Sequence, residues 1–361
     1  MARPTQAIVD LEALRHNGRL ARSLGGDGQL MAVVKANAYG HGAIPAAKAL
    51  EPLVSAFAVA CIEEAEELRN AGLTRPIMLM EGFFEPTELE IAARRDFWVM
   101  LQNRWQLETL EAAPLPKPLT CWLKLDSGMH RLGFALDESA DLLKRLRALN
   151  NVADEVVLAT HLACADELDN DFTPQQIKAF RQHTDALGAP CSMANSPGIL
   201  GWPDARGAWN RAGVMLYGQS PFPGPHPEAD KLKPVMTLQS QVIAVREVAA
   251  GETVGYGGAW TARRNSQIAT VPVGYGDGYP RNAGNGTPVL INHRRAPLVG
   301  RVSMDMITVD VTDLPPVAVG EPVELWGNGI TANEVAAHAN SIGYEVMTRM
   351  LPRVPRIYSG Q

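Results

Sequence analysis

Short apolar runs alternate with amphipathic stretches along residues 30–218. The runs have the composition of buried strands, and the stretches between them repeat apolar positions every three or four residues, as helices do when one face packs on a sheet. The candidate strands are 30–35, 56–62, 76–82, 97–102, 119–126, 155–163, 190–196 and 210–218. The clearest helical stretches are 61–72, 85–95, 138–150 and 173–187. This alternation predicts an α/β fold with a parallel sheet, and eight strands predict a closed (β/α)8 TIM-like barrel.

The alternation stops at a proline-rich segment, residues 219–234. Proline fixes φ and removes an amide donor, so the segment predicts a linker. Strand-like runs separated by Gly, Pro and Asn follow, at 235–248, 266–274, 287–293, 296–311 and 321–327. One late helix is expected at 331–340, which begins with a Thr-x-x-Glu capping box. We predict a barrel over 1–230 and a mostly β C-terminal domain over 231–361, with the first few residues available to pair with the β domain.

Composition and charge limit the classes of partner. The 361 residues are 46% hydrophobic and 20% charged, with a net charge of −6 and scattered basic pairs, so we expect neither nucleic acid nor membrane as a partner. No segment looks long and apolar enough to cross a bilayer, and the N-terminal sequence lacks the apolar core of a signal peptide. The four cysteines show neither paired nor zinc-site spacing. We therefore expect a cytoplasmic protein without a metal site.

Polar residues stand at the ends of several predicted strands. The C-terminal strand ends of such a barrel face one common site, so polar residues there are informative. Lys35 closes the first strand, Asp126 and Arg131 follow the fifth, His161 the sixth and Ser196 the seventh. A lone strand-end lysine is more typical of a protein surface. Because other strand ends also carry polar residues, Lys35 becomes a candidate for a partly desolvated amine that forms a Schiff base.

Two further segments are candidates for an anion site. Ser196 stands where a helix could begin, and Gly213 offers a backbone amide at the next strand end, so together they would make a phosphate cradle. Two tight turns explain the same residues equally well. The glycine-rich segment 273–280 lacks the spacing of a dinucleotide-binding loop and follows no βα crossover.

Nine motifs in order along the chain resemble alanine racemase. They are AVVKANAYGHG, KLDSGMHRLGF, ATHLACAD, ANSPG, RAGVMLYG, VGYGGAWTA, PVGYGDGYPR, GRVSMDM and GYEVMTRM. The lysine motif alone would be shared with other barrel-type pyridoxal-phosphate proteins. The whole series implies an amino-acid racemase, an isomerase that interconverts L- and D-alanine. Its product would supply peptidoglycan synthesis, or the enzyme would serve alanine catabolism.

The resemblance also implies the cofactor contacts. Lys35 would carry pyridoxal 5'-phosphate, and Arg211, supported by His161, would face the pyridine nitrogen. A guanidinium keeps its proton, so it cannot hold one on that nitrogen as a carboxylate would. The ring then accepts less negative charge, which favours racemisation over transamination. The positions that match phosphate contacts are Tyr39, Ser196, Gly213, Val214 and Tyr344.

Racemisation needs a base on each face of the substrate α-carbon, because a single base tends to return the proton where it came from. The resemblance implies Lys35 for one face and Tyr256 for the other; without it, Tyr256 is better interpreted as a packing residue in a Gly-rich turn. Arg131 matches the residue on the phenolic-oxygen and substrate-carboxylate side, and Lys124 matches a lysine that is carbamylated in many relatives. Further matches line the substrate site or its entrance: Tyr275, Arg281, Met304 and Asp305.

The family forms a head-to-tail homodimer with shared active sites, so the resemblance implies that Tyr256, Tyr275 and Met304 come from the partner. Three other functions use a similar lysine. An amino-acid decarboxylase of the same barrel class needs no second base and usually has an acidic pyridine partner. A non-catalytic cofactor carrier would be a barrel alone, and an aldolase would contain no bound chromophore.

Overall fold

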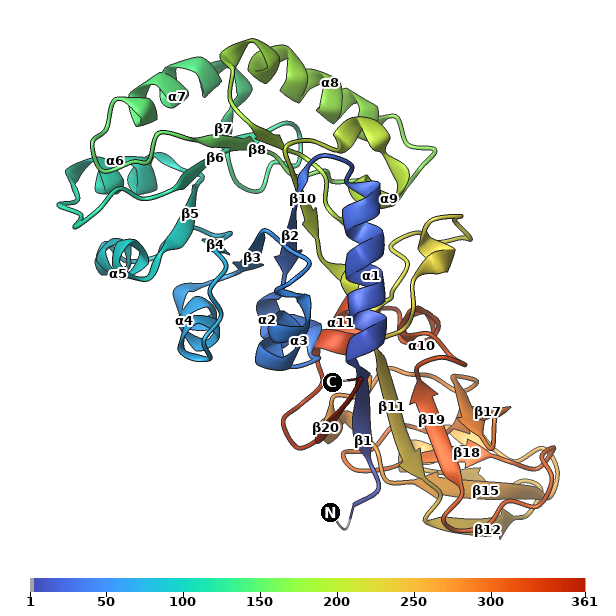
Figure 1. Ribbon diagram of the computed structural model, residues 1–361. Coiled ribbons are helices and arrows are strands. Elements are labelled where there is room, and N and C mark those ends of the chain that lie inside the picture. The colour runs from blue at the N-terminus through green and yellow to red at the C-terminus, as the bar shows by residue number, and fades with distance from the viewer. Residues whose placement is uncertain (1–2, 361) are drawn as a thin grey trace.

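The protein has two lobes, which a computed structural model describes over residues 3–360 (Figure 1). The larger lobe is built on eight parallel strands in the order β10-β2-β3-β4-β5-β6-β8-β9. They are β2 (Gln29–Val33), β3 (Ala56–Val59), β4 (Ile77–Leu79), β5 (Phe97–Leu101), β6 (Cys121–Asp126), β8 (Val157–Ala159), β9 (Cys191–Ser192) and β10 (Trp209–Ala212). The Arg211 amide donates to the Ala194 carbonyl (3.0 Å), which joins the two ends of the sheet. The predicted barrel is therefore confirmed.

Helices form the outer ring of the barrel (Figure 1). The apolar stripes of these helices face the strands. Among the described residues, no α-helix follows β10 before the β lobe begins, and α1 takes the place of that helix by packing between α3 and α9. The helices are α1 (Leu11–Leu24), α3 (Ala43–Leu50), α4 (Ile62–Asn70), α5 (Thr87–Arg95), α6 (Arg104–Ala112), α7 (Ser139–Arg147), α8 (Phe172–Thr184) and α9 (Ser196–Gly201). A short strand, β7 (Phe134–Ala135), pairs with β6.

The smaller lobe is a nine-stranded sheet of order β12-β15-β18-β17-β16-β19-β11-β1-β20. Its strands are β1 (Gln6–Asp10), β11 (Met236–Gln241), β12 (Ala244–Val248), β15 (Ser266–Val271), β16 (Pro288–Ile291), β17 (Arg294–Val299), β18 (Ile307–Asp310), β19 (Pro322–Trp326) and β20 (Arg356–Ser359). The first strand of the chain thus lies in the second lobe, antiparallel to β11 and parallel to β20. A separate hairpin joins β13 (Thr253–Val254) to β14 (Trp260–Thr261).

Two helices accompany this sheet where one was expected. α10 (Ala332–His338) is the predicted helix, and its N-cap Thr331 accepts a hydrogen bond from the Glu334 amide (3.1 Å). α11 (Gly343–Thr348) was not predicted, and it packs against the start of the barrel. Within residues 3–360, no helix combines the length and the apolar character needed to cross a bilayer.

Candidate active site

The interior of the barrel changes from apolar to polar at its C-terminal end. Alternate residues of a strand face the same side, and the buried inner layer includes Met31, Val33, Trp122, Ala159 and Trp209. Lys124 and Arg211 stand two residues further along their strands, and Lys35 and His161 stand two residues beyond the ends of theirs. All four side chains line one place, above an aromatic floor in which the Trp122 and Trp209 rings lie 5.6 Å apart.

A cavity of about 660 Å³ opens at this end of the barrel. Its lining brings together every barrel residue that the sequence analysis assigned to a cofactor, together with Tyr344 from α11. The assigned residues among its lining are Lys35, Tyr39, Lys124, Arg131, His161, Ser196, Arg211, Gly213, Val214 and Tyr344. Residues that the sequence analysis did not assign also line it: Val33, Ala36, Met80, Glu81, Leu132, Asn195, Pro197 and Thr348.

The sequence analysis predicted that Lys35 ends the first barrel strand. In the structure, Lys35 instead begins a left-handed turn. β2 ends at Val33, the Val34 amide still pairs with Ala58, and α2 (Lys35–Tyr39) follows, with φ of 52°, 54° and 51° at Ala36, Asn37 and Ala38. Residues with a Cβ rarely adopt this conformation, so surrounding contacts must hold it. The turn lets Lys35 and Tyr39, which are four residues apart, both line the same cavity.

Two side chains that the sequence analysis missed support this turn. Glu64 in α4 accepts a hydrogen bond from the Ala36 amide (2.6 Å) and another from the Ala60 amide (2.9 Å). His41 is fully buried and stacks on Tyr217, and burial lowers its pKa to about 4, which keeps the ring neutral. Because carbonyl oxygens can only accept, Nδ1 carries the ring hydrogen and donates to the carbonyls of Ala38 and Tyr39, 3.0 Å away in each case. Neither residue ends a strand, so no strand-end pattern identifies them.

Ser196 and Gly213 lie side by side, as the anion-site interpretation requires. Ser196 begins α9, whose N-cap Asn195 accepts from the Gly198 amide (3.1 Å). From the sequence we expected the Gly213 amide to be available to an anion. In the structure it donates to the Ser196 hydroxyl oxygen (2.9 Å). A Cβ at Gly213 would lie only 2.7 Å from the Tyr39 hydroxyl, so this position is a cradle that only glycine leaves open.

The cavity is strongly cationic. Burial, and then the charges of Arg211, Arg131 and Lys35, lower the pKa of Lys124 to about 8. The same causes hold the pKa of His161 well below its usual value, so its imidazole is neutral at pH 7. Burial lowers the pKa of Arg211 to about 10, which still leaves its guanidinium charged. Such a site favours anions, because each anionic group relieves repulsion among the cations.

Arg211 is held by neutral acceptors. Its Nη1 donates to the carbonyl and hydroxyl of Ser192 (3.0 and 2.5 Å), and its Nη2 donates to the carbonyls of Thr160 (2.7 Å) and Met193 (3.2 Å). No carboxylate of residues 3–360 forms an ion pair with it. The guanidinium is therefore fixed in direction and keeps its full positive charge.

The remaining predicted residues lie on the β lobe, outside this cavity. Tyr256 is at the tip of the hairpin between β13 and β14 and is 73% exposed. Tyr275 and Met304 are also exposed, at 38% and 52%, Arg281 is exposed, and the Asp305 side chain is half exposed. Within one chain, the barrel residues come together and the β-lobe residues do not join them.

The comparisons with known proteins agree over the whole chain. Residues 9–221 match the family model "Alanine racemase, N-terminal domain", and residues 235–358 match "Alanine racemase, C-terminal domain". A catabolic alanine racemase of Pseudomonas putida is 54% identical over 359 residues, which cover 99% of this chain and 100% of that protein.

Solved structures give the same result. The biosynthetic alanine racemase of Pseudomonas aeruginosa superposes with a TM-score of 0.96 at 48% identity, covering 99% of this chain and 100% of that one. The alanine racemase of Acinetobacter baumannii gives 0.93 at 38% identity, with 99% and 100% covered. The chain therefore belongs to the alanine racemase family, whose members are isomerases.

Proposed function

We propose that this protein interconverts L- and D-alanine, with pyridoxal 5'-phosphate attached to Lys35 and with its active sites shared between two copies. The observation that carries the proposal is the charge of the barrel-mouth cavity. Lys35, Lys124, Arg131 and Arg211 line it, and Glu81 is the one acid among its described lining residues. A phosphate, a phenolic oxygen and a substrate carboxylate would each be stabilised there.

The residues present fit this cofactor. Ser196, the backbone at Gly213 and Val214, and the hydroxyls of Tyr39 and Tyr344 would hold its phosphate, in the cradle that a Cβ at Gly213 would fill. Arg131 would hold the phenolic oxygen, and Arg211 would face the ring nitrogen. When bound, the cofactor withdraws electrons from an attached amino acid and so acidifies the hydrogen on its α-carbon.

The positive charge on Arg211 favours racemisation over transamination. A carboxylate at this position could keep a proton on the ring nitrogen by accepting its hydrogen bond, whereas the Arg211 guanidinium, with a pKa of about 10, stays protonated near neutral pH and cannot accept one. Negative charge then stays close to the α-carbon, so the proton returns there. This supports racemisation over transamination, and it disfavours a decarboxylase of the same barrel class, which usually has an acidic partner at this position.

The second base must come from elsewhere. Lys35 can take or give a proton on one face of the α-carbon. The tyrosines in the cavity stay protonated near neutral pH, because burial raises the pKa of Tyr39 to about 12 and also raises the pKa of Tyr344, so neither is ready to accept a proton. Tyr256 is exposed on the other lobe, as are Tyr275 and Met304, and a head-to-tail second copy would bury this face against the barrel mouth.

We propose further that Lys124 is carbamylated. Its side chain is crowded by other cations, and its pKa of about 8 makes the neutral amine available near physiological pH. The amine nitrogen would attack CO2 and lose a proton, which gives an anion in place of a cation. Repulsion from Arg131 would then become attraction.

The expected result for Lys124 is a carbamate carbon signal in the NMR spectrum of protein equilibrated with ¹³C-bicarbonate. The signal should vanish in Lys124→Ala and persist in Lys144→Ala, whose lysine is exposed on α7. A wild-type spectrum without the signal, or a signal that survives in Lys124→Ala, would remove this modification from the proposal.

The overall function is tested by assaying purified protein on a panel of L- and D-amino acids, with and without added cofactor. We expect visible absorbance from the lysine-bound cofactor and the fastest turnover with alanine. One extra methylene should lower kcat/KM by about 10- to 200-fold, because a small pocket discriminates by only about 1–3 kcal/mol per methylene. A colourless protein, or one inactive on alanine, would contradict the proposal.

A further inference from the structure

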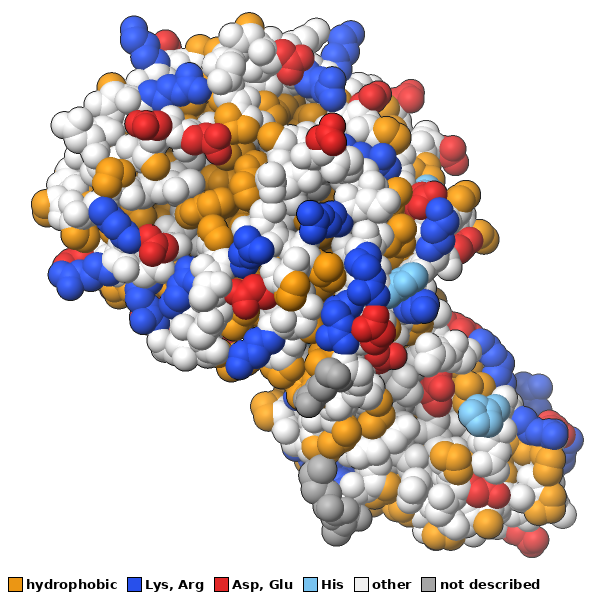
Figure 2. All heavy atoms as spheres, in the orientation of Figure 1, with side chains coloured by type: hydrophobic (Ala, Val, Ile, Leu, Met, Phe, Trp, Pro, Cys, Tyr) orange, Lys and Arg blue, Asp and Glu red, His pale blue; other side chains and the backbone are white. Residues whose placement is uncertain are grey.

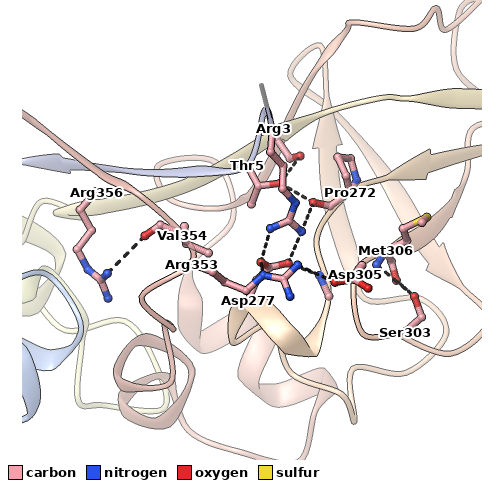
Figure 3. A network of polar contacts seen from close by, with 12 residues as sticks. Arg3, Thr5, Pro272, Asp277, Ser303, Asp305, Met306, Arg353, Val354 and Arg356 are labelled. Carbon is pink, nitrogen blue, oxygen red and sulfur yellow. Dashed lines mark hydrogen bonds and ion pairs between the residues drawn. The ribbon is translucent and has the colours of Figure 1, made fainter. Parts of the chain in front are cut away.

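A network of ion pairs around one buried carboxylate lies in the β lobe (Figure 3). The Asp277 carboxylate is fully buried and accepts two hydrogen bonds from Arg3, at 2.5 and 2.6 Å. It also pairs with Nε of Arg353 at 2.8 Å. The other arm of Arg353 extends to Asp305, with Nη2 2.6 Å from the carboxylate. One guanidinium therefore connects a buried acid to a half-exposed acid in a different loop.

This arrangement is energetically demanding. A buried carboxylate is tolerated only when it is paired and hydrogen-bonded, and losing one partner leaves an uncompensated charge. Asp277 meets the requirement with Arg3, Arg353 and the Gly274 amide (2.9 Å). Such networks can fix one arrangement of the chain, because alternative arrangements leave charges unpaired.

The network explains the glycine-rich segment 273–280, which no nucleotide site accounts for. The Tyr275 amide donates to the Ser303 carbonyl (3.1 Å), and the Gly276 amide donates to the Met304 carbonyl (2.9 Å). A Cβ at Gly276 would lie 2.8 Å from Nη1 of Arg353 and 3.0 Å from the Met304 carbonyl. Glycine thus lets the turn at Tyr275, the loop at Met304 and the Arg353 side chain pack together.

We propose that Arg353 is a positioning residue, which holds the Met304–Asp305 loop against the Tyr275 turn so that both enter the second copy's barrel mouth in one arrangement. The inference rests on the proposed function, since it is in the shared site that these loops face the substrate. The Asp305 end of the bridge is half exposed, and Met304 beside it is 52% exposed. Within one copy, the Arg353 guanidinium links the buried Asp277 to this loop through two different nitrogens, Nε and Nη2. A lysine carries its donors on one nitrogen at the end of a flexible stem, so it does not keep this fixed geometry.

The test measures kcat and KM for alanine in cofactor-loaded Arg353→Lys, Asp305→Asn and the double variant. We expect KM to rise about tenfold in each single variant with little change in kcat, because the loop binds substrate while the bases stay in place. The double variant should resemble the singles, because either change already breaks the bridge. Cofactor absorbance should be unchanged, since neither substitution changes a residue proposed to hold the cofactor. Arg264→Lys is the matched control, because Arg264 forms an exposed pair with Asp313 (2.6 Å) in the same lobe.

A purely structural role for Arg353 gives a different pattern. It would reduce the fraction of active enzyme, so the apparent kcat would fall while KM stayed constant. A fall in apparent kcat at constant KM would overturn the proposal. So would a wild-type KM in Arg353→Lys, or a rise in KM in the double variant equal to the product of the two single effects. If Arg353→Lys does not fold, Asp305→Asn carries the test alone, because its side chain is half exposed. Failure of the proposed function would appear separately, as a colourless protein or a fully active Tyr256→Phe variant.

Discussion

Replacing Tyr256 with phenylalanine is expected to slow racemisation by about 10²- to 10⁴-fold, the usual contribution of a general acid–base residue. The change removes one hydroxyl from a side chain that is 73% exposed in the single chain, so folding should be unaffected. Because the enantiomers have equal free energies, kcat/KM should fall equally in both directions. Circular dichroism of the alanine pool measures both rates.

Isotope exchange identifies which base is missing. In D2O, Tyr256→Phe should still exchange the α-hydrogen of the enantiomer that Lys35 deprotonates, which we expect to be D-alanine, without inverting it. Tyr279→Phe is the matched control, since the Tyr279 hydroxyl is buried without a hydrogen-bond partner among the described residues. Wild-type rates in Tyr256→Phe would remove Tyr256 from catalysis.

Replacing Lys35 with alanine should have the larger effect, a loss on the order of 10⁴-fold or more, because it removes both the covalent attachment of the cofactor and one base. The visible absorbance should disappear, and borohydride should no longer fix cofactor to the chain. In the wild-type protein the same treatment should leave the cofactor on the peptide that contains Lys35.

Lys117→Ala is a suitable comparison for Lys35. Lys117 precedes β6 at the opposite end of the barrel, where it forms an exposed ion pair with Asp96. This variant should keep its absorbance and activity. Activity that survives in Lys35→Ala, or borohydride labelling of another lysine, would contradict the assignment of Lys35.

The barrel could be predicted because apolar runs alternate with amphipathic helical stretches, although several strands are shorter than the predicted runs. The strand-end position indicated His161, the resemblance indicated Lys124 and Arg211, and all three line one cavity. The turn at Lys35 could not be predicted, because positive φ at Ala36, Asn37 and Ala38 depends on Glu64 and His41, which are distant in sequence or buried behind the turn.

Other features depend on contacts that no local pattern contains. Tyr344 reaches the cavity on α11, a six-residue helix too short to show a clear periodicity. The glycines of 273–280 reflect close packing around Asp277 and Arg353, which lie far apart in sequence. Surface charge does not locate the site either, because positive and negative side chains are scattered over the face in Figure 2.

In the proposed function, the second half of the site comes from another copy of the chain. Tyr256, Tyr275 and Met304 lie on an exposed face of the β lobe, and burial raises the pKa of Tyr39 and Tyr344, the two tyrosines among the described residues that line the barrel mouth. The resemblance supplied both the second base and the dimer. The structure of one chain supports them by leaving the face exposed.

The central claim is that Lys35 of one copy works with Tyr256 of another, and a mixed dimer tests it most directly. Lys35→Ala and Tyr256→Phe chains are expressed together with different tags, and the dimer carrying both tags is purified. One of its two sites would combine both changes and the other would be intact, so the account predicts about half the wild-type activity from two nearly inactive parents. A mixed dimer no more active than its parents would contradict a shared active site.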